Sequence, residues 1–326
     1  MTVSNVLNGR YRSSPHRDAI LEAVARLNYQ LDPSAQRLAA GQSRRMIGIF
    51  SLAMDLGVFT LTMTRIQRRL VEQGYTVPLD VHNLFHEAAN ADQIALIRNL
   101  CQQRPRAIVA NTAYMSKAAL GVLKEYQDGG GEVVRYGMAP TDTSSDEVVF
   151  DEESNSYRAA LALIRAGHTK MGFRSHGFPK AETLRMRGFR RALEEHGLAP
   201  RAEWMFSGPT YEEGGADLAR QFLELRERPT GICIVNDNSA SAFVNQITRA
   251  GFRVPDDVSV VGHDDMPAAK YALVPLTTAA FPVAEIADAV ASLLLGRLEG
   301  SYQGPRRLVT FAGDVVARES VAAPRG

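Results

Sequence analysis

Residues 231–262 read GICIVNDNSASAFVNQITRAGFRVPDDVSVVG, and this stretch decides the fold. Apolar residues fill 231–235 and return at 258–262, each time as a run of a length that suits a buried strand. The residues between them, 238–250, are typical of an amphipathic helix. Two strands joined through a helix form a right-handed crossover in which the strands are parallel. The stretch therefore predicts one unit of a parallel α/β sheet.

The same alternation of strands and helices extends in both directions along the chain. The other expected strands are 46–50, 76–79, 107–110, 132–135, 170–174, 203–206, 308–311 and 315–321. The other expected helices are 59–72, 92–102, 116–127, 154–166, 182–196, 212–225 and 283–298. Two such series predict an α/β fold with two doubly wound parallel-sheet subdomains, which bind ligands at the carboxyl ends of their strands.

The composition is that of an ordinary globular protein, with 326 residues, 45% hydrophobic and 22% charged. Cys101 and Cys233, the two cysteines, lie in apolar surroundings, which predicts buried thiols rather than a disulfide or a metal site. No apolar run is long enough for a membrane span, and the first residues lack the apolar segment of a secretory signal. We expect a cytoplasmic protein without a membrane partner.

Positive charge is concentrated at the N-terminal end. The chain has a net charge of +1, yet residues 1–45 contain seven arginines against Asp18, Glu22 and Asp32. A basic segment beside a mildly acidic body is typical of a nucleic-acid-binding arm. Solvated surface arginines would give the same count, so the charge alone leaves both interpretations open.

Two helix starts follow each other in this basic segment. Ser14-Pro15 combines an N-cap with proline at the first helical position, and the apolar residues up to Leu27 lie on one face. Asp32-Pro33 repeats the signal, and Gly41 ends a short helix after about two turns. The polar residues 42–45 form a linker, so we place a domain boundary after residue 45.

The order of these segments resembles the LacI family of transcription regulators, on the stretch TVSNVLNG at 2–9, the two helices and nearly all of 46–326. In that family a recognition helix, a third helix and a hinge helix precede a core of the type I periplasmic-binding-protein fold. The resemblance implies a partial all-α helix-turn-helix headpiece at 1–45, with its hinge helix at 32–41, and an effector-binding and dimerisation domain at 46–326. Its N-subdomain takes about 46–143 plus part of 275–310, and its C-subdomain takes about 144–274 plus part of 311–326.

The resemblance also implies a set of DNA contacts: Thr2, Ser4, Asn5, Asn8, Tyr29 and Leu38. The first three open the recognition helix, which lies in the major groove, and the next two suit contacts with the DNA backbone. The leucine matches the hinge-helix wedge that opens a base step from the minor groove. The operator is then palindromic and the protein a homodimer. Ordinary surface helices with a scattered leucine are the alternative.

One part of the headpiece pattern is missing. The helix that precedes and braces the recognition helix has no counterpart, because Met1 falls inside the motif. Either translation starts upstream, which the basic arm and the hinge helix favour, or the headpiece is truncated. We expect the 326-residue chain by itself to bind operator DNA weakly or not at all.

Six residues match the positions at which the family binds its effector: Phe59, Asn111, Phe150, Arg185, Asn236 and Asp264. The four polar residues lie at or near strand ends or a helix start, where open α/β sheets bind ligands. Their donors and acceptors suit a polyhydroxyl, such as a sugar or its derivative, or a small anion. The two phenylalanines resemble the family's apolar walls. Any single Asp or Asn at a strand end is more often a helix cap.

Three neighbours of these residues have structural interpretations. Asp237 is the expected cap of helix 238–250, and Asp265 is expected to brace its loop. His263 lies beside Asp264 and could titrate near neutral pH, but a packed histidine is the preferred interpretation.

Sequence patterns for catalysis and metal binding are absent. His82 and His86 stand four residues apart, but Asp80 and Asn83 predict a loop there, and no HExxH order is present. The sequence also lacks a nucleophile elbow, a P-loop and a dinucleotide-binding glycine motif. We therefore expect no enzyme, no metal and no cofactor.

The sequence as a whole predicts an effector-responsive, DNA-binding transcription regulator of the repressor type. It would sense a sugar-like or other small polar molecule in the cleft between two subdomains. The main alternative is a sugar-binding protein of the same core fold without specific DNA binding, a class that would carry a signal peptide in place of 1–45. An enzyme of doubly wound fold is a more remote alternative.

Overall fold

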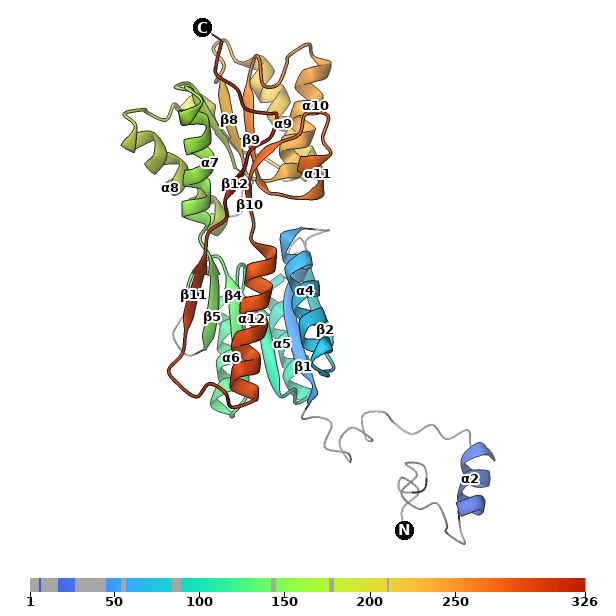
Figure 1. Ribbon diagram of the computed structural model, residues 1–326. Helices are drawn as coiled ribbons and strands as arrows, with labels where there is room; N and C mark the ends of the chain where they lie inside the picture. Colours follow the sequence, from blue (N-terminus) through green and yellow to red (C-terminus); the bar gives the residue numbers. More distant parts are fainter. Residues whose placement is uncertain are drawn as a thin grey trace.

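The computed structural model describes residues 6, 17–26, 45–53, 57–83, 89–141, 145–175, 179–209 and 211–325. Within these residues the chain forms two six-stranded sheets, one in each half of the core (Figure 1). Every pairing between strands in the two sheets is parallel except one at the edge of the second sheet, as crossover connections require. The predicted α/β class with two doubly wound parallel sheets is confirmed.

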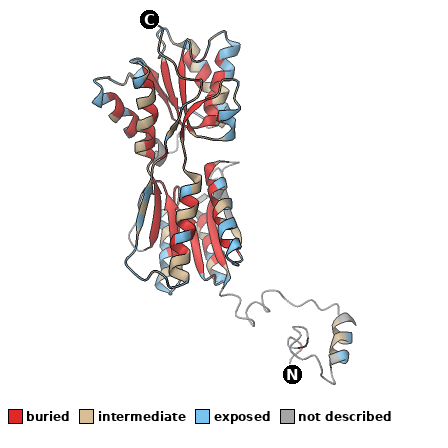
Figure 2. Ribbon diagram, in the orientation of Figure 1, coloured by how far each residue is buried: buried red, intermediate tan, exposed pale blue. Residues whose placement is uncertain are grey.

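The first sheet has the strand order β11-β5-β4-β3-β1-β2. Its strands are β1 (Ile47–Ala53), β2 (Leu79–Asn83), β3 (Ala107–Asn111), β4 (Glu132–Gly137), β5 (Asp146–Phe150) and β11 (Leu308–Phe311). Its helices are α4 (Val58–Glu72), α5 (Ala89–Gln102), α6 (Lys117–Asp128) and α12 (Val283–Leu298). Helices α4 and α12 pack on one face and α5 and α6 on the other, so the central strands are buried on both sides (Figure 2).

The second sheet has the strand order β12-β10-β9-β8-β6-β7. Its strands are β6 (Met171–Arg174), β7 (Met205–Phe206), β8 (Gly231–Ile234), β9 (Ser259–Asp264), β10 (Thr277–Ala280) and the antiparallel β12 (Val315–Val316). Its helices are α7 (Glu152–Arg165), α8 (Pro179–Glu195), α9 (Tyr211–Glu224), α10 (Asp237–Arg249) and α11 (Pro267–Lys270). Helices α7 and α8 cover one face, and α9 and α10 cover the other.

The chain passes between the two halves three times: from β5 to α7, from β10 to α12 and from β11 to β12 (Figure 1). Backbone hydrogen bonds join these passages, with Ala280 N donating to Asp314 O at 2.9 Å and Asp151 N to Phe311 O at 2.8 Å. Gly313 lies so close that a Cβ there would stand 1.7 Å from the Ala280 carbonyl oxygen. The three passages therefore form one packed hinge.

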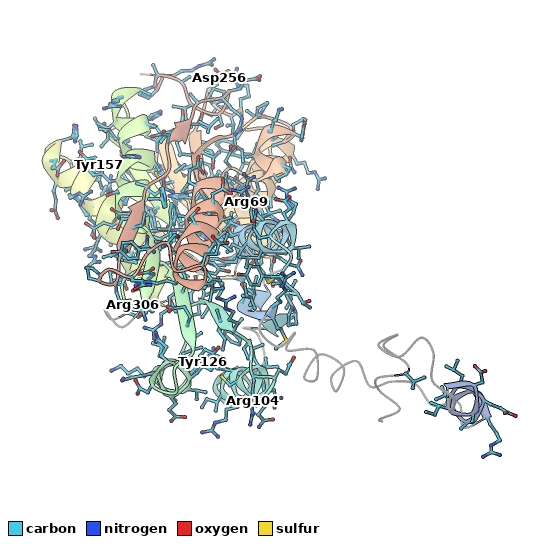
Figure 3. The ribbon with its side chains drawn as sticks, turned by 60° about the horizontal axis from the view of Figure 1, so that its bottom comes forward. Arg69, Arg104, Tyr126, Tyr157, Asp256 and Arg306 are labelled. Carbon is cyan, nitrogen blue, oxygen red and sulfur yellow. The ribbon has the colours of Figure 1, made fainter. Side chains whose placement is uncertain are left out.

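Figure 3 shows the extent of the core on either side of this hinge. Arg104 and Tyr126 lie at the far end of the half that holds the first sheet, and Asp256 lies at the far end of the other half. The helix α2 (Arg17–Arg26) falls inside the helix predicted from Ser14-Pro15. Among the helices that the structure describes, none is both long and apolar enough to cross a membrane.

Four sequence predictions need correction. The strand expected at 76–79 begins only at Leu79 and continues to Asn83, because these residues pair with Ile49–Ala53 of β1, so 80–83 is not a loop. Thr76 makes an isolated bridge to Met46. The strand expected at 315–321 is limited to β12, and Cys101 is only partly buried whereas Cys233 is buried.

Strands β5 and β10 were not expected from the sequence. Strand β5 begins with two carboxylates, Asp146 and Glu147, that are nevertheless fully buried. Asp146 accepts hydrogen bonds from Arg297 and Arg307, and Glu147 accepts from the Thr141 hydroxyl at 3.0 Å. Charged residues are rarely buried unless paired, and a sequence pattern does not reveal the pairing.

Candidate functional site

A cavity of about 50 Å³ lies between the two halves of the core, where the carboxyl ends of both sheets face each other. It has room for only a few water molecules. The residues that line it are Gly57, Val58, Phe59, Tyr114, Met138, Glu152, Arg185, Tyr211, Val235, Asn236, Asp264 and Phe281. Strand ends and helix starts of both halves thus line one space, as expected for the ligand site of a doubly wound fold.

The most strongly bonded group in the cavity wall is Arg185, on α8. Its Nε lies 2.6 Å from Glu152 Oε2, and its Nη2 lies 2.8 Å from Glu152 Oε1, so the pair is bidentate. Its Nη1 donates to the carbonyl oxygen of Val235, and its Nη2 lies 3.6 Å from Asp264 Oδ1. Both Arg185 and Glu152 are buried. The guanidinium of Arg185 therefore connects α8 by hydrogen bonds to the start of α7 and to the residue that follows β8.

Asp264, the last residue of β9, reaches the cavity through an unusual backbone. Its φ is +103° and that of Asp265 is +54°, both in the left-handed region that non-glycine residues rarely adopt. Asp265 braces the loop through a 2.5 Å ion pair with Arg318, as predicted. Burial raises the pKa of Asp264 to about 6; Arg185 opposes this rise and Glu152 adds to it. The negative charge of Asp264 is thus only partly balanced by the positive charge of Arg185.

The cap of α10 is Asn236, which corrects the prediction that Asp237 has this role. Asn236 Oδ1 accepts from Ser239 N at 2.7 Å, and its Nδ2 has no hydrogen-bond partner among the described residues. Asp237 is fully buried and accepts from the Thr278 hydroxyl at 2.7 Å and from Met266 N at 2.8 Å. Both oxygens of Asp237 thus bond to residues outside α10, and the cap is one residue earlier.

His263 is packed, as preferred from the sequence. The side chain is fully buried, and its Nδ1 donates to the Ile234 carbonyl oxygen at 2.9 Å. Burial, with a contribution from Arg185, lowers the pKa of His263 to about 3. The imidazole therefore stays neutral at physiological pH and adds no charge to the cavity.

Aromatic rings form the apolar side of the cavity. Phe59 makes edge-to-face contacts with Phe281 and Tyr114, at ring-centroid distances of 6.0 and 6.3 Å. Phe150 lies against Phe281 at 4.3 Å but is not part of the cavity lining. Asn111 is also outside the lining, fully buried, with its Oδ1 accepting from Ala113 N at 2.9 Å.

The structure thus brings together four of the six residues expected at the effector site, namely Phe59, Arg185, Asn236 and Asp264. The other eight lining residues were not expected from the sequence: Gly57, Val58, Tyr114, Met138, Glu152, Tyr211, Val235 and Phe281. For Glu152 a signal was available, because the acidic run 151–153 directly follows the apolar residues that end β5. The aromatic residues carried no comparable signal, since their spacing resembles that of core positions.

The six expected DNA contacts lie outside the described residues: Thr2, Ser4, Asn5, Asn8, Tyr29 and Leu38. His86 and the side chain of His82 lie outside them as well. In the part of the chain that the structure describes, no group of three or more His, Cys, Asp or Glu side chains is arranged to hold a metal ion.

Comparison with known proteins identifies relatives that cover nearly the whole chain. A family model described as a periplasmic binding protein-like domain matches residues 160–321. The HTH-type transcriptional repressor PurR of Aliivibrio salmonicida is 28% identical, across 98% of this chain and 94% of that protein.

Two solved structures share the fold along the chain. The Lac repressor dimer bound to operator and the anti-inducer ONPF has a TM-score of 0.77 at 23% identity, covering 98% of this chain and 94% of that one. The complex of the transcriptional regulator CelR with cellobiose has a TM-score of 0.73 at 20% identity, covering 98% and 95%. All three of these proteins are named as regulators rather than as enzymes.

Proposed function

We propose that this chain, which belongs to the LacI family of transcriptional regulators, is a cytoplasmic repressor that binds operator DNA and responds to a small polar effector. The observation that carries the proposal is the similarity to a transcriptional repressor over 98% of the chain. That alignment extends beyond the sugar-binding-type core into the basic N-terminal segment. A binding protein without DNA recognition would have no use for that segment.

The effector site in this proposal is the cavity between the two halves. Arg185, Asn236 and Asp264 offer its polar groups, and Phe59 supplies an apolar wall. Phe150 supports the site by packing behind Phe281, and in this proposal Asn111 becomes accessible only when the halves move apart. Because about 50 Å³ is too small for a sugar-sized molecule, the two halves have to move apart for entry.

Coupling to DNA follows from the hinge. A ligand that contacts both halves changes their relative orientation, and the three packed passages transmit this change across the core. In the proposal the N-subdomain, about 46–143, then orders or releases the hinge helix at 32–41, and a homodimer presents two such helices to a palindromic operator. Thr2, Ser4, Asn5, Asn8 and Tyr29 would contact the major groove and backbone, with Leu38 in the minor groove.

The experiment that tests this function is selection of genomic DNA fragments by the protein purified from its own cells. We expect enrichment of one palindromic site, bound with an affinity that falls steeply with salt because arginines displace counterions from phosphates. Leu38→Ala should weaken binding to this site, whereas Leu61→Ala, on the exposed side of α4, should not. If no sequence is enriched although the protein binds small molecules, the chain is a ligand-binding protein and the repressor proposal is wrong.

A further inference from the structure

One edge of the guanidinium in the cavity is already occupied by a carboxylate of the protein. An arginine binds a carboxylate or phosphate through two parallel N–H groups on one edge. In Arg185 the edge formed by Nε and Nη2 is occupied by both oxygens of Glu152, and Nη1 is bonded to the Val235 carbonyl. The remaining Nη2 direction faces Asp264 at 3.6 Å. Glu152 therefore occupies the Nε–Nη2 edge, and the one remaining Nη2 direction already faces a carboxylate.

The charges that face the cavity leave a negative excess. Among the side chains that the structure describes there, one arginine, Arg185, faces two carboxylates, Glu152 and Asp264. Behind them, Asp265 is compensated by Arg318, and burial raises the pKa of the fully buried Asp237 well above its usual range. Two further described groups at the site add no charge of either sign, because His263 stays neutral and burial raises the pKa of the Tyr114 phenol. An unbalanced carboxylate in such a place attracts a cation.

Two further features of the cavity wall suit a ligand that carries a polar oxygen and a ring. Asn236 is only 7% exposed, lines the cavity, and has an Nδ2 without a hydrogen-bond partner among the described residues. An amide N–H in this position donates to a hydroxyl or ether oxygen. The rings of Phe59 and Phe281 border the same space, where they can contact a ring face and attract a cation.

We propose that the cavity takes a small hydroxylated amine, protonated and preferably cyclic, with its ammonium group at Asp264 and an oxygen at Asn236 Nδ2. An amino sugar is the simplest molecule of this class. The proposal rests on the assignment of this cavity as the effector site. It narrows the effector class from small polar molecules in general to hydroxylated amines. It also excludes the small anions that the sequence left open.

The test compares matched probes that differ only in charge, measured by calorimetry and ligand-observed NMR on the intact protein without DNA at pH 7. One series is glucose, glucosamine and glucuronate, and the other is cyclohexanol, cyclohexylamine and cyclohexanecarboxylate. We expect the amine of each series to bind at least about tenfold more tightly than the neutral member, with no detectable binding of the acid. Equal affinities within both series, including no binding at all, or preference for an acid, overturn the proposal.

Variants assign the preference to the cavity. Asp264→Asn should reduce the ratio of amine affinity to neutral-probe affinity to about one. Asp256→Asn, at the far end of the second half, should leave this ratio unchanged (Figure 3). Glu152→Gln frees one edge of Arg185, so this variant should bind inorganic phosphate at least about tenfold more tightly than the unmodified protein. An amine preference that survives Asp264→Asn, or phosphate binding already present in the unmodified protein, contradicts the assignment.

The pH dependence gives a second readout. Protonation of Asp264, with its pKa of about 6, removes the anion, so the affinity for cyclohexylammonium should fall about tenfold between pH 7 and pH 5. A flat profile overturns the role of Asp264. None of these measurements contains DNA, so a negative result here does not contradict operator binding. A failed selection of operator fragments likewise does not contradict the amine preference of the cavity.

Discussion

At the residue scale, the Arg185–Glu152 pair has a structural role besides its position in the cavity. Both side chains are buried, and they connect α8 to the start of α7. A buried ion pair adds little net stability, but removal of one partner leaves an uncompensated charge. The same pair therefore restricts what the cavity can bind and makes single substitutions costly.

Arg185→Met should lower the free energy of unfolding by about 3–5 kcal/mol, because Glu152 then remains buried and unpaired. The double variant Arg185→Met/Glu152→Met should recover most of this loss. Urea unfolding of the two single variants, the double variant and the unmodified protein gives the coupling energy. Additive single effects would show that the two side chains do not act as a buried pair.

Asp264 should make the ligand-free protein less stable as the pH rises. Its pKa in the folded state, about 6, exceeds the ordinary 3.8, so the folded form binds the proton more tightly than the unfolded form. This contribution is fully present below about pH 4 and is lost as the pH rises through 6, with a total of about 3 kcal/mol. Unfolding midpoints measured from pH 4.5 to 7 should converge with those of Asp264→Asn at low pH. Parallel profiles would contradict the raised pKa.

At the element scale, the orientation of Glu152 depends on the close contact between α7 and α8. Gly188 on α8 lies so near α7 that a Cβ there would stand 2.0 Å from the Glu153 carbonyl oxygen. Backbone atoms cannot yield as a flexible side chain can, so the two helices would have to separate. The close packing of α7 against α8 thus requires a glycine at position 188.

Gly188→Ala should therefore destabilise the protein by about 2 kcal/mol and lower its melting temperature. The matched control is Gly121→Ala in α6, where a Cβ meets nothing within 4 Å. There the substitution should stabilise the helix by about 0.5–1 kcal/mol, since alanine loses less backbone entropy than glycine. Calorimetry that finds the two substitutions equivalent would contradict the close packing.

The elements also show how far the sequence predicts the site. Periodicity identified most strands and helices of the described core, because apolar runs and amphipathic helices reflect burial directly. It missed β5, where buried carboxylates are paired with distant arginines, and with it the position of Glu152. It also left a small anion open as a ligand of Arg185, since a sequence cannot show that a carboxylate 33 residues away occupies one edge of this arginine.

At the scale of the whole molecule, the cavity and the hinge are parts of one arrangement. The cavity lies between the halves, and the passages that connect the halves are packed tightly enough that Gly313 admits no side chain. A movement of one half is therefore a movement about this hinge rather than a local loop change. An occupant that contacts both Phe59 and Asp264 bridges the two halves directly.

Gly313→Ala should change the response to ligand more than the affinity for it. The added Cβ displaces Ala280 and alters the preferred orientation of the halves, while the cavity wall keeps its residues. We expect the effect of the bound amine on operator affinity to fall by about tenfold, a coupling change within the usual range. Fluorescence anisotropy of the operator measures this, and an unchanged coupling would show that the passages do not transmit the signal.

The most direct test of the account measures reciprocal coupling in the protein purified from its own cells. Operator affinity is determined with and without the amine that binds best in the matched series, and amine affinity is determined with and without operator DNA. We expect both ratios to differ from one and to be equal, because a single linkage connects the two sites. Specific operator binding that is unaffected by the saturating amine would contradict it.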